Sequence, residues 1–157
     1  MARLRSIQPR LRRFLQIGGR RRALLSEAVL WLVVARLALI TIPFPVVARR
    51  LGRFVPPSDP RVNDATQPSD REAALAREIG WAVTRAAHYV PFRAVCLPQA
   101  MAARVMLKCR GVGSVMHFGA AKGAEKPLDT HAWLDAAGVE VTGYPVAAQF
   151  AEIACFV

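Results

Sequence analysis

The spacing of apolar residues predicts helices in the first half of the chain. Apolar side chains recur every three to four positions over 23–55 and again over 71–90, which is the period of a helix with one apolar face. Pro43 ends the first stripe, and residues 56–69, rich in Pro, Asp, Ser and Asn, are typical of a linker or surface loop. We therefore predict two apolar helical pieces within 23–55, a loop, and a second helical segment that Asp70 caps.

After Pro91 the pattern shortens and changes. It predicts one helix over 96–110, stopped by Gly111, and then three strands over 114–118, 130–135 and 139–142. The last two strands form a hairpin with a three-residue turn, Ala136 to Gly138, in which the glycine takes the left-handed position. Helices followed by a small antiparallel sheet predict an α+β fold whose core spans residues 70–157.

Charge is concentrated at the start of the chain. Residues 1–22 hold eight arginines and no acidic residue, so only +3 of the net charge of +11 remains for the other 135 residues. Such a basic arm is typical of a solvated terminus, or of a segment that attracts anionic lipid or an acidic partner. Nucleic acid is not a favoured partner, because Phe14 is the only aromatic residue in the arm.

The apolar segment 23–55 raises the question of a membrane helix. Hydrophobic residues make up 54% of the chain, which argues against disorder. Arg36 interrupts the apolar run, and Pro43 and Pro45 follow, so a clean span of about 20 residues is not available. We expect the segment to pack on the core. Peripheral membrane contact, helped by the basic arm, is the alternative.

Three cysteines bear on the compartment and on the chemistry. Cys96, Cys109 and Cys155 form an odd set with no CxxC pair and no spacing typical of a metal site. The start of the chain lacks the apolar core and cleavage site of a secretory signal. We expect a reduced, cytoplasmic protein that binds no metal or cofactor directly, with Cys109 and Cys155 as inert filler.

Cys96 begins the predicted helix over 96–110. Pro98 fits only the first turn of that helix, where its missing N–H costs nothing. The unpaired N–H groups of the turn and the helix dipole favour a thiolate, and the same groups would stabilise an oxyanion during acyl transfer. Cys96 is therefore the candidate nucleophile, the alternative being a small buried apolar residue.

The strand over 130–135 carries one imidazole, His131, among apolar neighbours. An imidazole that faces a cysteine at a helix start forms a thiolate–imidazolium pair, so His131 is the candidate base. A histidine on a strand is also commonly structural. Three further residues are lower-ranked candidates: Gln99 for the oxyanion site, Trp133 for the wall of the cleft, and His117 as a second histidine on the neighbouring strand. Each is explained more simply as a structural residue.

Around the two candidate residues the chain reads CLPQAMAARVMLKCRGVGSVMHFGA over 96–120 and HAWLDAAGVEVTG over 131–143. Over residues 70–150 it resembles the C-terminal protease domain of lasso-peptide B proteins, within the transglutaminase-like superfamily. The arginine-rich start and the segment LLSEAVLWLVVARLAL, residues 24–39, also resemble the stand-alone protease half of split B proteins. The resemblance implies a transglutaminase-like or papain-like cysteine protease core preceded by N-terminal helices. In that core a cysteine-bearing helix packs on a small antiparallel sheet that carries the histidine.

The resemblance also implies a reaction and partners. Cys96 would attack the last peptide bond of a leader, and His131 would accept and return the proton. The partners would be a lasso precursor peptide, a separate leader-recognition protein and an asparagine-synthetase-like cyclase. Any ATP dependence would come through the cyclase, because the chain has no GxxxxGK loop. Two alternatives stay open: another amidase or acyltransferase, and an inactive binding or membrane-associated module.

The third catalytic residue is the open point of the resemblance. In the family an acid on the following strand orients the imidazole, but hairpin pairing places Gly143 opposite His131. Asp135 shares the strand face of His131 but lies about 13 Å along it, so it is the weak candidate. The acids Asp129, Glu125 and Glu140 lie nearby, and a backbone carbonyl or amide is a further way to orient the ring.

Overall fold

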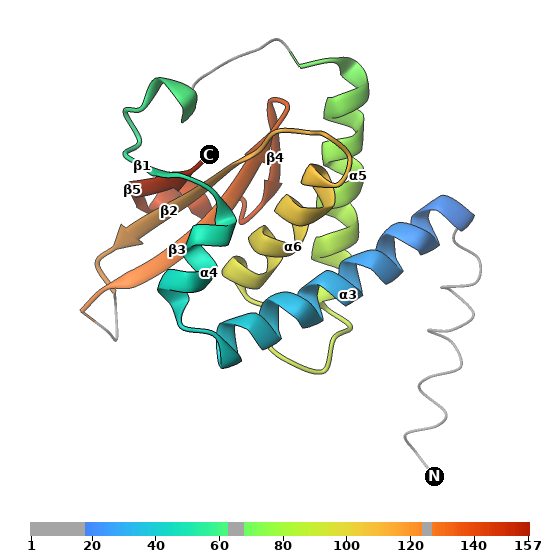
Figure 1. Ribbon diagram of the computed structural model, residues 1–157, viewed down its shortest axis with the longest axis horizontal. Coiled ribbons are helices and arrows are strands. Elements are labelled where there is room, and N and C mark those ends of the chain that lie inside the picture. Colours follow the sequence, from blue (N-terminus) through green and yellow to red (C-terminus); the bar gives the residue numbers. More distant parts are fainter. Residues whose placement is uncertain (1–17, 63–67, 124–126) are drawn as a thin grey trace.

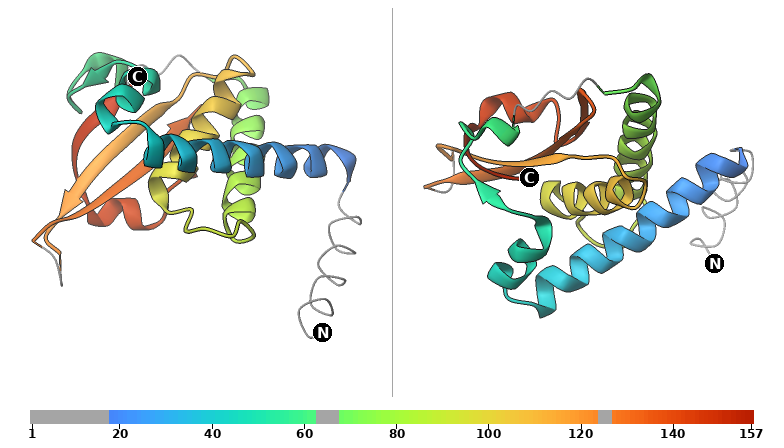
Figure 2. Two further views of the ribbon diagram at one scale, coloured as in Figure 1. Left: turned by 60° about the horizontal axis from the view of Figure 1, so that its bottom comes forward. Right: turned by 45° about the horizontal axis from the view of Figure 1, so that its top comes forward.

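A computed structural model of the chain describes residues 18–62, 68–123 and 127–157 (Figure 1). Most of the predicted basic arm, residues 1–17, and the candidate acid Glu125 lie outside the described residues. Within the described part, two long helices cover one face of a five-stranded antiparallel sheet and a third long helix packs across them, as the two further views in Figure 2 also show. This arrangement is the α+β fold that the sequence predicts.

The apolar segment forms two helices that pack on the core. Helix α3 spans Gly19–Thr41, and α4 spans Phe44–Leu51 with Pro45 in its first turn. One side of α3 is buried against the other helices, through five residues: Leu24, Leu25, Ala28, Leu32 and Ala35. By length and composition α3 is also long and apolar enough to cross a membrane, and 28% of its most apolar stretch is buried in the fold.

Two helix starts differ from the sequence prediction. Helix α3 begins at Gly19, so the last four residues of the predicted arm are helical, and Arg20 pairs with Glu78 at 2.7 Å. Helix α5 spans Asp70–Ala87, but its cap is Ser69 rather than Asp70. The Ser69 hydroxyl accepts from the Glu72 N–H, and the Glu72 carboxylate accepts from the Ser69 N–H, which is a complete capping box.

Helix α6 spans Cys96–Lys108 and ends at the turn before Gly111, whose φ of 73° favours glycine. It packs between α3 and the sheet and contacts strands β3 and β4. Arg110, just past its end, donates to both carboxylate oxygens of Glu27 on α3, at 2.9 and 2.6 Å. The two-pronged ion pair joins α3 to the far end of the helix that begins with Cys96.

The sheet has the strand order β1-β5-β2-β3-β4. Its strands span the following residues: β1 Phe54–Val55, β2 Val115–Ala121, β3 Asp129–Ala136, β4 Val139–Thr142 and β5 Ala151–Phe156. Short 3-10 turns cover Pro60–Val62 (η1) and Val146–Gln149 (η2). The predicted hairpin of β3 and β4 is confirmed, but Ala136 pairs with Val139, so its turn has two residues and not three. Both of them, Ala137 and Gly138, have positive φ, as a tight hairpin turn requires.

Strand β5 is the main element that the sequence pattern did not predict. It lies between β1 and β2 and makes the C-terminal segment an inner strand of the sheet. Arg104 of α6 ties this region to the helical layer, since its guanidinium donates to the carbonyls of Ser114 and Phe156 at 2.6 and 3.0 Å.

The two faces of the sheet have different neighbours. Met116 and Leu134 are register partners, and both belong to the buried cluster that includes Leu107 of α6. The next pair, His117 and Trp133, stacks ring on ring and therefore lies on the opposite face, because side chains alternate along a strand. The sheet thus has a helix-covered face and a second face that carries both β-strand histidines.

Candidate functional site

Cys96 occupies the first position of α6 and is half-buried. The preceding residue, Val95, makes no side-chain cap, and Pro98 occupies the first turn, as the sequence predicts. In the described part of the chain, no acceptor lies in hydrogen-bond position for the N–H groups of Cys96 and Leu97. The thiol therefore stands beside free backbone donors and at the positive end of the helix dipole.

Gln99 holds the backbone segment that leads into α6. Its side-chain amide donates to the Ala94 carbonyl at 2.6 Å, and its backbone N–H donates to the Val95 carbonyl at 3.3 Å. Gln99 thus fixes the backbone just before Cys96. The side-chain donor that the sequence suggested for an oxyanion site is used in this contact.

His131 is half-buried on β3, and a backbone carbonyl holds its ring. Nε2 lies 2.7 Å from the carbonyl oxygen of Gly143, and since a carbonyl only accepts, Nε2 carries the proton in this contact. The ring also stacks on Phe150 at 5.0 Å and on Trp133 at 6.1 Å between centroids. Gly143, the residue that strand pairing predicted opposite His131, thus fills the place of the missing acid, and Nδ1 remains the nitrogen for another partner.

Cys96 and His131 do not contact each other as a catalytic pair in the structure. No hydrogen bond joins their side chains in the described residues. His131 shares the face of Trp133, whereas α6 packs on the helix-covered face. Strand β4 ends at Thr142, opposite Leu134, so no β4 residue pairs with His131 and the edge of β3 is free of a strand there. The pairing of Cys96 with His131 therefore stays a prediction.

Asp135 has partners other than His131. Its Oδ1 accepts from the Tyr144 hydroxyl at 2.7 Å, and its Oδ2 lies 3.2 Å from Nε2 of His117. No hydrogen bond to His131 is present among the described residues, in agreement with the expected separation along the strand. Of the other candidate acids, Asp129 and Glu140 are exposed on β3 and β4.

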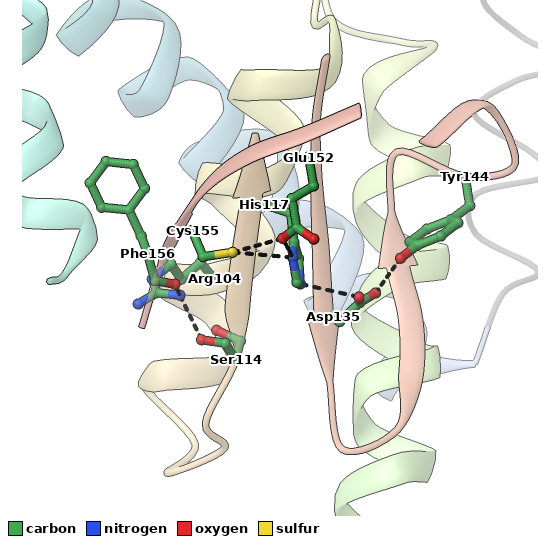
Figure 3. A network of polar contacts seen from close by, with 8 residues as sticks. All are labelled: Arg104, Ser114, His117, Asp135, Tyr144, Glu152, Cys155 and Phe156. Carbon is green, nitrogen blue, oxygen red and sulfur yellow. Dashed lines mark hydrogen bonds and ion pairs between the residues drawn. The ribbon is translucent and has the colours of Figure 1, made fainter. Parts of the chain in front are cut away.

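A second polar cluster, which the sequence does not predict, lies on the same face as His131 (Figure 3). It is a chain of contacts along three strands and the loop after β4, and its members are Cys155, Glu152, His117, Asp135 and Tyr144. The sequence reading treated His117 as structural and Cys155 as filler. Only the placement of β5 beside β2 brings these residues together, and no local sequence signal points to that pairing.

The cluster shifts the pKa values of its members. Burial alone would lower the pKa of His117, but hydrogen bonds and charge from Asp135 and Glu152 outweigh it and raise the pKa above its ordinary value. Burial and the neighbouring Glu152 raise the pKa of the Cys155 thiol to about 12. Burial and Asp135 also raise the pKa of Tyr144. Cys155 is therefore a protonated, fully buried thiol and not an activated nucleophile.

Comparison with known proteins gives a family. A family model described as the transglutaminase-like superfamily matches residues 38–155, from the end of α3 to the last strand. The match includes Cys96, His131 and all of the sheet except Phe156, the last residue of β5. No match was found among curated proteins or among solved structures. On the extent of this match, the chain belongs to the transglutaminase-like superfamily.

Proposed function

We propose that this chain is a cysteine peptidase that removes the leader from a lasso-peptide precursor, with Cys96 as nucleophile and His131 as general base. Membership of the transglutaminase-like superfamily supports acyl-transfer chemistry at a cysteine. The finer assignment to lasso-peptide maturation is supported by the resemblance of residues 96–120 and 131–143 to that family of proteases.

The observation that carries the proposal is the position of Cys96. It is the first residue of α6, with no side-chain cap before it and with free backbone N–H groups beside it. Of the three cysteines, Cys155 is fully buried, and Cys109 lies at the opposite end of the same helix. Cys96 is therefore the cysteine whose surroundings suit an attacking thiolate.

The proposed reaction assigns one role to each candidate residue. His131 Nδ1 takes the thiol proton, and the Cys96 sulfur attacks the carbonyl carbon of the final leader residue. The tetrahedral oxyanion is stabilised by the N–H groups of Cys96 and Leu97. His131 then protonates the amine of the core peptide, which leaves, and water hydrolyses the thioester to free the leader acid.

The Gly143 carbonyl replaces the usual carboxylate as the group that orients His131. It fixes the tautomer, because Nε2–H donates to it and Nδ1 is then left as the acceptor for the thiol proton. A neutral carbonyl stabilises an imidazolium less than a carboxylate does. Contacts between catalytic groups often form only in the substrate complex, and the proposal requires the peptide-bound state to bring Cys96 and His131 together.

The proposed partners come from the same resemblance. They are the precursor peptide, a separate leader-recognition protein and an asparagine-synthetase-like cyclase, through which ATP dependence would enter. We place the reaction in the cytoplasm, supported by the free state of all three cysteines. Peripheral membrane contact is part of the proposal, supported by the exposed apolar side chains of α3 and the arginines of residues 1–22.

The proposal is tested by reconstituted cleavage. The purified chain is incubated with the precursor, the leader-recognition protein, the cyclase and ATP, and the products are identified by mass spectrometry. Wild type is expected to release the leader. Cys96→Ala and His131→Ala are expected to lose at least about a thousandfold in rate, because each removes a group that the chemical step needs.

Matched variants control for general damage. Cys109→Ala removes an exposed cysteine of the same helix, and His88→Ala removes an exposed histidine at the end of α5. Both should cleave at the wild-type rate. Leader release by Cys96→Ala at a rate near that of Cys109→Ala would contradict the nucleophile assignment.

A second candidate keeps the chemistry and changes the substrate. The family match extends to the superfamily and not to a named activity, which favours a test of other acyl transfers. Wild type is therefore also given a glutamine-containing peptide with an amine, and an unrelated amide substrate. Turnover of these that depends on Cys96, without leader cleavage, supports the amidase or acyltransferase reading.

A further inference from the structure

The second cluster contains three groups with the chemistry of metal ligands. Nδ1 of His117, an oxygen of Glu152 and the sulfur of Cys155 all lie within 4.8 Å of one another. His117 comes from β2 and the other two from β5, and His117 and Cys155 are register partners across the two strands. The pairing of the strands therefore builds the group, although the cysteine spacing in the sequence gives no sign of it.

We propose that His117, Glu152 and Cys155 bind a divalent zinc ion. An imidazole nitrogen, a carboxylate oxygen and a thiolate sulfur form a mixed set that suits this borderline-soft cation. On binding, the Cys155 thiol would release its proton, and the resulting thiolate and the Glu152 carboxylate would together carry the two negative charges that balance the ion. The site goes beyond the proposed peptidase function, since neither Cys96 nor His131 is a ligand.

One of the three distances between the ligand atoms already suits a tetrahedral ion. Metal–ligand distances of about 2.0 to 2.3 Å require neighbouring ligand atoms to lie about 3.3 to 3.6 Å apart. Sγ of Cys155 and Nδ1 of His117 are 3.6 Å apart. The Glu152 oxygen lies closer to both, at 2.7 Å from the sulfur and 2.5 Å from Nδ1, so binding would require its side chain, which is 30% exposed, to withdraw by about 1 Å.

Asp135 and Tyr144 supply the outer support that a metal-bound histidine needs. Nε2 of His117 is buried and makes no well-aligned hydrogen bond, but Oδ2 of Asp135 lies 3.2 Å from it. The Tyr144 hydroxyl in turn donates to the other oxygen of Asp135. A carboxylate behind the histidine fixes which nitrogen faces the metal and makes that nitrogen more basic.

The proposed ion would have an open fourth position and a structural effect. His117 and Cys155 are buried, and the partly exposed Glu152 is the side from which the ion and a water molecule would enter. Binding would join β2 to β5. Since the ligands meet only in the folded sheet, zinc is expected to raise the midpoint of thermal unfolding.

The test measures metal binding by the full chain in a non-thiol reductant. Zinc content after dialysis is measured by elemental mass spectrometry, and cobalt is added as an optical probe. We expect one zinc per chain, a thiolate-to-cobalt absorption band, and a rise in melting temperature with zinc. Glu152→Gln and Cys155→Ser should each weaken zinc binding at least tenfold and remove the thermal shift, and Cys155→Ser should also remove the cobalt band.

Two controls separate the site from other causes. Cys109→Ser removes an exposed thiol and should keep the zinc, the cobalt band and the thermal shift. Glu152 is partly exposed, so Glu152→Gln leaves a folded protein in which circular dichroism checks the fold independently of metal. If wild type binds no zinc, or if Glu152→Gln and Cys155→Ser bind it as tightly as wild type, the proposed site is wrong.

Discussion

Cys96 and Cys109 stand at opposite ends of one helix, so a single element gives the two thiols opposite electrostatic surroundings. Cys96 is the first residue of α6, and Cys109 is its C-terminal cap. Unpaired N–H groups and the positive end of the dipole favour a thiolate at the start of a helix, and free carbonyls disfavour one at its end. Cys109 is nevertheless the more exposed of the two.

Alkylation rates at neutral pH distinguish the effect of thiolate formation from the effect of side-chain exposure. Cys96 should react with iodoacetamide at least about tenfold faster than Cys109, because the thiolate is the reacting species. Cys155, which is fully buried, should react only after unfolding. Peptide mapping of a time course measures all three rates. Faster reaction at Cys109 than at Cys96 would support the reading of the chain as an inactive module.

Gly143 is a second position where one residue controls the candidate site. Its φ is 91°, and an added Cβ would lie 2.5 Å from Cβ of Trp133 and 2.8 Å from the Ala132 carbonyl oxygen. Any side chain here would push the loop away from β3. The position that hairpin register predicts opposite His131 thus demands glycine in this chain, and its carbonyl is the part that contacts His131.

Gly143→Ala should therefore lower both stability and leader cleavage. The matched variant is Gly111→Ala, because Gly111 also has positive φ but an added Cβ meets nothing within 4 Å. Gly111→Ala should cost about 1 to 2 kcal/mol of unfolding free energy, and Gly143→Ala at least about 2 kcal/mol more. Urea unfolding measures both. Equal losses of unfolding free energy in the two variants would contradict the close packing of Gly143 against β3.

At the scale of elements, the Glu27–Arg110 pair holds α3 against the end of α6. Hydrogen bonds from Arg110 lower the pKa of Glu27 below its ordinary value of 4.5, although burial opposes the shift. Because the carboxylate has the lower pKa in the folded state, the pair stabilises the fold above pH 4.5. That contribution is lost as the pH falls from 4.5 through the lowered value.

Glu27→Gln should lower the free energy of unfolding by about 1 kcal/mol at pH 7. The difference from wild type should shrink as the pH falls below 4.5, because protonated Glu27 resembles glutamine. Urea unfolding over pH 3 to 7 measures it. Glu140→Gln, at an exposed carboxylate, is the control and should change stability little at any pH. A difference for Glu27→Gln that stays constant with pH would contradict the linkage.

Elements with a strong local pattern were predicted from the sequence, and those that depend on distant pairing were not. The start of α6 at Cys96, its end before Gly111 and the β3–β4 hairpin all follow from local signals. The Ser69 cap was missed although Ser69 and Glu72 have the spacing of a capping box. Strand β5 has no alternation that marks it, and its place beside β2 comes from the packing of the whole domain.

The candidate site was likewise predicted only where its residues follow from local sequence signals. Cys96 and His131 stand out by motif, and hairpin register predicts that Gly143 lies near His131. The hydrogen bond to the Gly143 carbonyl depends on the path of the chain after β4, which the pattern does not give. The cluster of His117, Glu152 and Cys155 needs the position of β5 and was beyond sequence reasoning.

At the scale of the whole molecule, α3 presents apolar side chains away from the core. Leu30 and Leu37 are 58% and 54% exposed, and they lie two turns apart on the same side of the helix. The chain also carries a net charge of +11, eight units of it within the first 22 residues. An apolar helix face with a basic segment before it suits the surface of an anionic membrane.

Vesicle co-sedimentation tests this contact. Wild type should bind anionic vesicles more tightly than neutral ones, and Leu30→Ser with Leu37→Ser should weaken binding at least about tenfold. The matched control is Leu128→Ser with Ile153→Ser, because these side chains are 56% and 57% exposed but lie outside α3. Equal effects of the two double variants, or no binding by wild type, would remove membrane contact from the proposed function.

The nucleophile is the central claim, and covalent capture tests it most directly. A synthetic leader peptide that ends in a vinyl sulfone in place of the cleaved bond is incubated with the chain and the leader-recognition protein. The labelled residue is then identified by peptide mapping. The proposed function predicts one equivalent of label on Cys96, slower labelling of His131→Ala and none of Cys96→Ala. Label on Cys109 or Cys155, or equal labelling of Cys96→Ala, would contradict it.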